Sequence, residues 1–354
     1  MSTTKIFISD VHIGAGRYCS ESQDKSKYPH DWDWLSKGEK ENFIRFLDYL
    51  PTRYAANTEV VLLGDIFDNW IFPHDLEPPT IEDVIGADEN QGVMVALKTL
   101  SEKLNVFYVP GNHDMHADRA VINAHFPRVR YVAEQYHSER LIAEHGHRYA
   151  LFNAPPRFSR NISGLPLGYF ISRMEATRKA RYNNGGRHYK TYVDDFLEIL
   201  GKATLSQGVF EAVLEETKLS DNEVFVFRNY SGARQTVDAE TIKDTYANLY
   251  DDWNSQVISR PRAVMAELDR LEPIADRLCK HGKYKVCIMG HSHKFDVDVD
   301  RAFVDDRVYA NAGYWCGAQC TFVEVNLTGR QYGVSLKQWN ANGTVKTLVP
   351  TKKV

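Results

Sequence analysis

Residues 59–68 read EVVLLGDIFD, and this stretch indicates how the chain folds. Its apolar half, Glu59 to Leu63, has the length and composition of a strand that is buried on both faces. Its polar half places Asp65 and Asp68 directly after that strand, at a glycine turn. In α/β proteins, the loops at the carboxyl ends of the strands converge and bind ligands. The stretch therefore predicts an α/β fold with a functional site at that edge of the sheet.

The same succession of apolar strand and polar turn recurs four more times in the chain. The four turns are Asp10-Val11-His12, Gly111-Asn112-His113-Asp114, His145-Gly146-His147 and Gly290-His291-Ser292-His293. Residues two apart in an extended chain point to one face, so we expect Asp10 and His12 to reach one point together. The same spacing leads us to expect His291 and His293 to reach neighbouring points. Each turn alone could be a solvated strand end, but the five together indicate one shared site.

These side chains are the ligands that a pair of divalent cations requires. Carboxylate and neutral imidazole ligands suit Mn, Fe, Zn or Ni, with Mg also admissible, and Mn is our first expectation. Asp65, at a tight glycine turn, suits a carboxylate that bridges two ions, and Asn112 can add a neutral oxygen ligand. His113 can donate a proton to a departing alkoxide. Asp68 could orient a neighbouring histidine.

The remaining sequence divides into a core and an insertion. Residues 41–50 have helical apolar spacing, which we expect Pro51 to end, and residues 93–104 predict another helix. Between residues 151 and 280 the alternation of strands and helices gives way to mostly helical, amphipathic segments. We therefore expect a core of residues 1–150 and 281–354, with residues 151–280 forming a helical cap.

Composition excludes several classes of protein. The formal net charge of -4 gives no overall basic footprint, which argues against a dedicated duplex-DNA binder. Five cysteines without a CxxC pair disfavour a disulfide framework or a thiolate zinc site. No stretch has the ~20 continuous apolar residues of a membrane span, and the N-terminus has no signal-peptide pattern. The cytoplasm is therefore the expected compartment.

The five turns, in order, resemble the motifs DxH, GDxxD, GNH[DE], H and GHxH of the calcineurin-like metallophosphoesterase superfamily. The resemblance covers the expected core but not the cap, and it implies a four-layer αββα sandwich. It further implies one metal bound by Asp10, His12, Asp65 and His293, and a second bound by Asp65, Asn112, His145 and His291. His113, supported by Asp68, would protonate the leaving group. The ions would activate a bridging hydroxide that attacks phosphorus in line.

Three segments look more specifically like the UDP-2,3-diacylglucosamine pyrophosphohydrolase branch of that superfamily. These are residues 7–14, the run GDIFDNW at 64–70, and Asn311-Ala312-Gly313-Tyr314-Trp315. The chain has His113 where many enzymes of that branch have Arg, and it has a histidine in His145-Gly146-His147 where they commonly have Asp. We therefore expect a hydrolase of phosphodiester or pyrophosphate bonds in a nucleotide- or lipid-linked substrate. The alternatives are a nuclease or a phosphomonoesterase of the same superfamily, while a non-catalytic scaffold is disfavoured because every ligand position is filled.

The start of the cap is strongly basic. Between residues 157 and 190 it holds eight basic residues against the single acid Glu175: Arg157, Arg160, Arg173, Arg178, Lys179, Arg181, Arg187 and Lys190. Interleaved with them are the apolar residues Leu165, Leu167, Tyr169, Phe170, Ile171 and Met174. This segment could be an anion-attracting lid with an apolar face for an acyl chain, a nucleobase or a membrane surface. It could equally be a solvated cationic helix whose apolar stripe packs on the protein.

Overall fold

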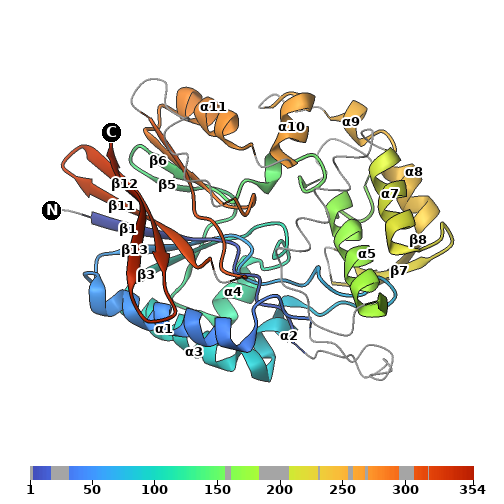
Figure 1. The fold of residues 1–354 in the computed structure, drawn as a ribbon, viewed down its shortest axis with the longest axis horizontal. Coiled ribbons are helices and arrows are strands. Elements are labelled where there is room, and N and C mark those ends of the chain that lie inside the picture. Colours follow the sequence, from blue (N-terminus) through green and yellow to red (C-terminus); the bar gives the residue numbers. More distant parts are fainter. Residues whose placement is uncertain are drawn as a thin grey trace.

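The computed structural model describes residues 3–16, 32–155, 161–182, 207–229, 232–253, 258–267, 270–294, 307–317 and 319–354. Two β-sheets pack face to face, and helices cover the outer face of each, α1 and α3 on one side and α11 on the other (Figure 1). This arrangement confirms the predicted αββα sandwich. No helix in the described part of the chain has the length and apolar character that a membrane crossing requires.

The larger sheet has seven strands in the order β13-β12-β11-β1-β2-β3-β4. Their bounds are β1 Thr3–Ile8, β2 Glu59–Leu63, β3 Asn105–Val109, β4 Arg130–Tyr131, β11 Thr321–Thr328, β12 Gln331–Trp339 and β13 Val345–Lys353. Strands β1 to β4 are mutually parallel, so their carboxyl ends share one edge. Strands β11 to β13 extend the sheet as an antiparallel meander beside β1.

The smaller sheet has four strands in the order β10-β9-β6-β5. Its strands are β5 Tyr136–Ser138, β6 Leu141–Ala143, β9 Val286–Met289 and β10 Val308–Asn311. Strands β6, β9 and β10 are parallel, which brings the turns after β6 and β9 to one edge. Segments separated by more than 140 residues thus lie side by side.

Alternate residues of the central strands face two different hydrophobic clusters. Val60 and Leu62 pack with helices on the outer face of the larger sheet, whereas Val61 and Leu63 pack between the sheets. The outer layer on this side contains α1 Lys37–Arg53, α2 Ile81–Gly86, the 3-10 turn η1 Asp88–Asn90, α3 Gln91–Lys103 and α4 Arg119–His125. Burial on both faces explains why β2 is apolar without alternation.

Pro51 does not end the first helix, contrary to the expectation from sequence. Helix α1 continues through Pro51 to Arg53, and Tyr54 N donates to Leu50 O at its end. Proline in a helix interior removes one hydrogen bond and crowds the preceding turn. Here it lies in the last turn, where little of the helix remains to be disrupted.

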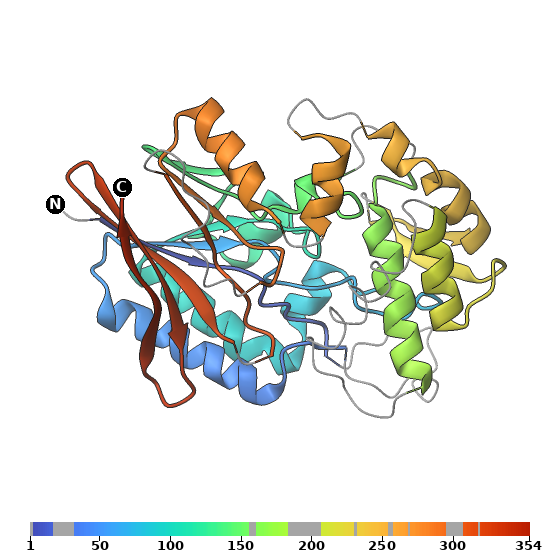
Figure 2. The same ribbon diagram turned by 45° about the horizontal axis from the view of Figure 1, so that its top comes forward.

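The described part of the segment between the two parts of the core is mostly helical, as predicted, and most of it lies to one side of the two larger sheets in Figure 2. It contains α5 Leu167–Tyr182, α7 Gln207–Thr217, the hairpin β7 Val224–Arg228 and β8 Arg234–Asp238, α8 Ala239–Tyr246, α9 Leu249–Asp252 and α10 Arg260–Glu267. Helix α11 (Glu272–Gly282) contacts β9 and β10 of the smaller sheet. The helix expected at residues 193–200 lies outside the described residues.

The apolar residues at the start of the cap face inward. Leu165, Leu167, Tyr169, Phe170, Ile171 and Met174 are all buried in one cluster with α7, β7 and α8. Arg173, one of the basic residues, is also fully buried. For these residues the packed-stripe alternative is confirmed, and they form no exposed apolar face. Arg157, Arg160, Arg187 and Lys190 and the side chains of Lys179 and Arg181 lie outside the described part.

Candidate metal centre

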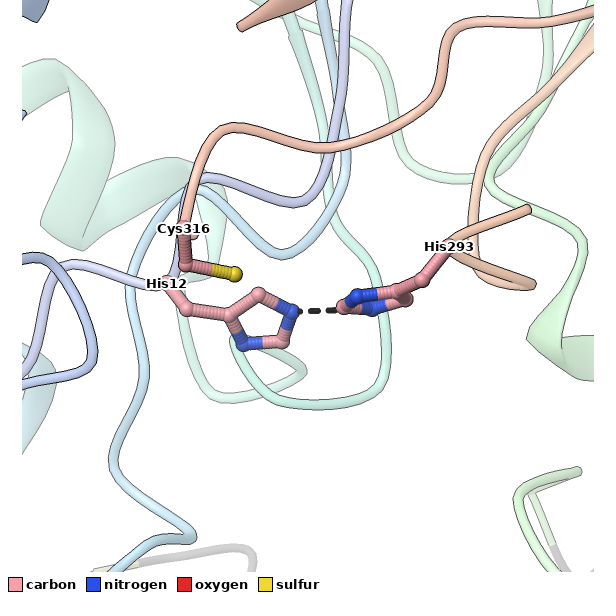
Figure 3. A group of neighbouring side chains, drawn as sticks. All are labelled: His12, His293 and Cys316. Carbon is pink, nitrogen blue, oxygen red and sulfur yellow. Dashed lines mark hydrogen bonds between the residues drawn. The ribbon is translucent and has the colours of Figure 1, made fainter. Parts of the chain in front are cut away.

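The predicted site residues gather at the carboxyl ends of β1, β2, β3, β6 and β9. A first group consists of Asp10, His12, Asp65 and His293, whose ligand atoms all lie within 4.8 Å of one another. Figure 3 shows His12 and His293 pointing toward each other from distant parts of the chain, with their Nε2 atoms 3.1 Å apart. The family resemblance implied one metal bound by these four residues, and the fold brings all four together.

A second group consists of Asp65, His145 and His291, again within 4.8 Å of one another. Nε2 of His145 lies 3.0 Å from Oδ2 of Asp65. Asn112, the fourth residue expected here, is buried on the loop after β3, and the next residue, His113, donates its backbone N–H to Oδ1 of Asp65. Asp65 therefore belongs to both groups, as expected of a bridging carboxylate.

The backbone at these turns is not extended, contrary to the expectation for the pair Asp10 and His12 and for the pair His291 and His293. Both residues have left-handed conformations, with φ of 56° and 53°, and so do Asp65, His291 and His293. Asp10 N donates to Gly64 O, and His12 N donates to Asp65 O. These bonds fold the turn after β1 onto the turn after β2. Such conformations cost about 1–2 kcal/mol each in residues with a Cβ, and they concentrate at functional sites.

Two glycines let the turns approach one another closely. A Cβ on Gly64 would lie 2.5 Å from the ring of His145, and Gly64 itself has φ of +85°. A Cβ on Gly111 would lie 2.1 Å from Oδ1 of Asp65 and 2.6 Å from its backbone nitrogen. Any larger residue at either position would displace the carboxylate or the imidazole beside it.

Asp68 joins two histidines through one oxygen. Its Oδ2 lies 2.8 Å from Nδ1 of His12 and 2.9 Å from Nδ1 of His113. Its Oδ1 accepts the backbone N–H groups of Trp70 and Ile71. The carboxylate thereby fixes the orientation of both rings and leaves the Nε2 atom of each directed away from Asp68.

The carboxylates and imidazoles of the centre are buried close together, and they shift one another's pKa values. Burial raises the pKa of Asp65, but the neighbouring His145 and His113 outweigh it and hold that pKa well below its usual range. Burial lowers the pKa of His145, but the carboxylates of Asp65 and Asp10 raise it to about 10. For His291, burial and then the charge at His145 lower the pKa to about 3. In the metal-free protein His145 therefore carries a proton, which a bound cation would displace.

The donor set fits a bound metal. Asn112 Oδ1 is buried and has no hydrogen-bond partner within the described residues. A buried polar atom without such a partner costs about 1–3 kcal/mol, which coordination to a cation would offset. The carboxylate, imidazole and amide donors match the preferences of Mn, Fe, Zn or Ni. The described residues can therefore hold one ion in each group.

Several contacts around the centre were not predicted from the sequence. Asp114 accepts hydrogen bonds from the backbone of Ile66 and Gly111, which ties the second and third turns together. Trp34 stacks on His12, and Trp70 stacks on His113. The motif GNHD contains Asp114, but nothing in the sequence indicates where its carboxylate points.

Cys316 adds a thiol to the first group. Its sulfur lies within 4.8 Å of ligand nitrogens of His12 and His293. Figure 3 draws the three side chains together. The sequence disfavoured a thiolate zinc site because no CxxC pair is present. The absence of a CxxC pair, however, gives no information on a single thiol that a distant loop brings to the site. Cys279, Cys287, Cys316 and Cys320 are free thiols.

Comparisons with known proteins agree with this geometry. A family model described as calcineurin-like phosphoesterase matches residues 4–295. A comparison with curated proteins finds no match. A solved structure from Streptococcus pneumoniae TIGR4, a conserved uncharacterised protein described as a predicted phosphoesterase, is 12% identical with a TM-score of 0.34. That alignment covers 100% of this chain and 98% of the other, and at this TM-score the likeness adds nothing to the description of the fold.

The family match spans all five turns and the segment between them, which is most of the chain. The two groups of ligand atoms provide the metal dependence that the family implies. The chain therefore belongs to the calcineurin-like phosphoesterase family and is a metal-dependent hydrolase of phosphoric esters.

Proposed function

We propose that the protein binds two divalent metal ions and hydrolyses a phosphodiester or pyrophosphate bond. The observation that supports this most is the position of Asp65, which lies within ligand distance of both groups. Two cations a few ångströms apart repel each other strongly, and a shared carboxylate offsets that repulsion. When bound, the ions would polarise the phosphoryl oxygens and activate a water molecule for attack. Manganese remains our first expectation for both positions.

Within this proposal each side chain has a definite task. Asp10, His12, Asp65 and His293 hold the first ion, and Asp65, Asn112, His145 and His291 hold the second. Asp68 keeps Nδ1 of His113 occupied, so that Nε2 of that ring can give a proton to the leaving oxygen. The rings of His12, Trp34 and Trp70 pack around the ring of His113, which limits the access of bulk water to its proton.

For the substrate, we propose a nucleotide- or lipid-linked phosphate ester or pyrophosphate, of which UDP-2,3-diacylglucosamine is one example. Support comes from the sequence resemblance at GDIFDNW and Asn311 to Trp315. The cytoplasmic location and the division into a core and a cap at residues 151–280 stay predictions. Contact with a membrane surface, if it occurs, would not use the six buried apolar residues at the start of the cap.

A substrate screen tests this proposal directly. The metal-reconstituted protein is offered a phosphomonoester, a phosphodiester, a nucleotide-sugar pyrophosphate and single-stranded DNA. We expect turnover of the diester or the pyrophosphate to exceed that of the monoester. Faster monoester turnover would make the protein a phosphomonoesterase, and a strong preference for DNA with steep salt dependence would make it a nuclease.

A further inference from the structure

A pocket opens directly beside the second group of ligands. Its volume is about 310 Å³, and it is lined by loops that follow β3, β4 and β6 together with Pro155 and Gly164 of the segment leading into the cap. Gly111 and His145 both line it, so it borders the residues that would hold the second metal ion. The volume lies at the lower end of the range for small-molecule sites, which suits one ring-containing group.

Among the described residues, Arg148 and Glu134 on the lining of this pocket carry opposite charges. Arg148 and Glu134, both on its lining, form an ion pair with 2.8 Å between Nη1 and Oε2. The pair cancels the charge that either residue would offer to a second phosphate. The remaining walls are formed by Met115, Tyr131 and Ala133 with two prolines, and by the ring of His147. Such a surface favours a flat, uncharged group with some hydrogen-bonding capacity over a phosphate or a metal.

The pocket borders the second group, whereas the ring of the proposed proton donor packs against the first. His113 packs against His12 of the first group, with ring centroids 4.8 Å apart, and also against Trp70. The pocket instead borders His145 of the second group and is not lined by His113. A phosphodiester carries two organic substituents, one that leaves and one that stays on phosphorus. The leaving substituent must lie next to its proton donor.

We propose that this pocket holds the ester substituent that remains on phosphorus, an uncharged ring-containing group of which a nucleoside is the model. This inference rests on the proposed function. It also gives a physical reason for diester preference, because a phosphomonoester has no second substituent with which to occupy the pocket. Binding energy from that substituent would position the phosphorus for attack.

The test keeps the leaving group constant and varies only the retained group. Two diesters of 4-nitrophenol are compared, one retaining a thymidin-5′-yl group and the other retaining a methyl group. Ala133 lies on the pocket wall and is exposed, so Ala133→Phe fills the pocket without disturbing the interior. Val95→Phe, at a residue 61% exposed on helix α3, is the matched control.

We expect the wild type to prefer the thymidine ester by at least about tenfold in kcat/KM. Ala133→Phe should remove most of that preference while changing the methyl ester less than about twofold, with metal content unchanged. Val95→Phe should behave as wild type. As a second measurement, thymidine alone should competitively inhibit hydrolysis of the methyl ester by the wild type and not by Ala133→Phe.

Two failures are distinguishable. If the wild type hydrolyses both diesters at similar rates, or if Ala133→Phe affects both equally, the assignment of the pocket is wrong and the proposed function stands. If the metal-loaded wild type hydrolyses neither diester but does hydrolyse 4-nitrophenyl phosphate, the proposed diesterase function itself is wrong.

Discussion

The indole of Trp70 stacks on the imidazole of His113, with ring centroids 4.5 Å apart and planes inclined by 30°. On its other side, Trp70 meets the edge of Tyr169, from helix α5 of the cap. The hydroxyl of Tyr169 accepts a hydrogen bond from Arg173, which also donates to the carbonyls of Phe72 and Pro73 just beyond Trp70. The cap thereby braces the ring that we propose as the proton donor.

Trp70→Leu should loosen His113 without removing it. We expect kcat to fall about tenfold for substrates with alkoxide leaving groups, because these depend on proton donation, and to change little for 4-nitrophenolate. The measurement is the dependence of kcat on leaving-group pKa, which should become steeper. Trp339→Leu deletes an equally buried indole that packs on Phe46 and Tyr49, far from the centre. If the dependence of kcat on leaving-group pKa steepens equally in Trp339→Leu, the effect of Trp70→Leu is general destabilisation and not a loss of support for His113.

His113→Ala should retain both ions and lose most turnover of poor leaving groups. General acid catalysis contributes about 10²–10⁴-fold, so the loss on an alkyl phosphodiester should fall in that range. Metal content by elemental analysis serves as the internal control, since His113 is not a ligand in either group. Wild-type activity of this variant on the alkyl ester would disprove the role assigned to His113.

Gly111→Ala should reduce metal occupancy. The added methyl group would meet Oδ1 of Asp65 at 2.1 Å and its backbone at 2.6 Å, so the shared carboxylate must move. We expect weaker binding of both ions in a manganese titration. Gly38→Ala is the matched control, because nothing lies within 4 Å of its added Cβ. Unchanged affinity in Gly111→Ala would mean that Asp65 is not needed in its present position.

Metal affinity should increase with pH. In the metal-free protein, burial lowers the pKa of His145, but Asp65 and Asp10 raise it to about 10, so this ring carries a proton at pH 7. A ligating imidazole must be neutral, so binding releases that proton. Each unit of pH increase between 6 and 9 should therefore strengthen binding by up to about tenfold. Calorimetry in two buffers of different ionisation enthalpy measures the number of protons released on metal binding. A metal affinity that does not change with pH would contradict this prediction.

The sequence predicted an α/β fold and the identity of the clustered side chains because both depend on local patterns, whereas the family resemblance implied the sandwich. Apolar strands such as β2 are recognisable from composition, and polar turns at their carboxyl ends must converge once the strands are parallel. Strand β13 was missed, because Val349 is its only buried residue and its sequence has no clear alternation. The left-handed turns at Asp10 and His12 were missed because they arise from hydrogen bonds to a different segment, not from local preference.

The contacts between cap and core could not be predicted either. Nothing near Arg173 in the sequence indicates that this cation is fully buried and satisfied by backbone carbonyls of a loop about a hundred residues earlier. Trp70 and Tyr169 look like ordinary core aromatics until the fold places one of them against His113. Long-range packing of this kind depends on three-dimensional structure, which a single sequence does not disclose.

Anomalous diffraction from crystals soaked in manganese tests the central claim, that scattered side chains assemble one pocket for two cations. We predict two peaks a few ångströms apart, one among Asp10, His12 and His293, the other among Asn112, His145 and His291, with Asp65 between them. An empty pocket after soaking with manganese or zinc, or a single ion located elsewhere in the molecule, would contradict it.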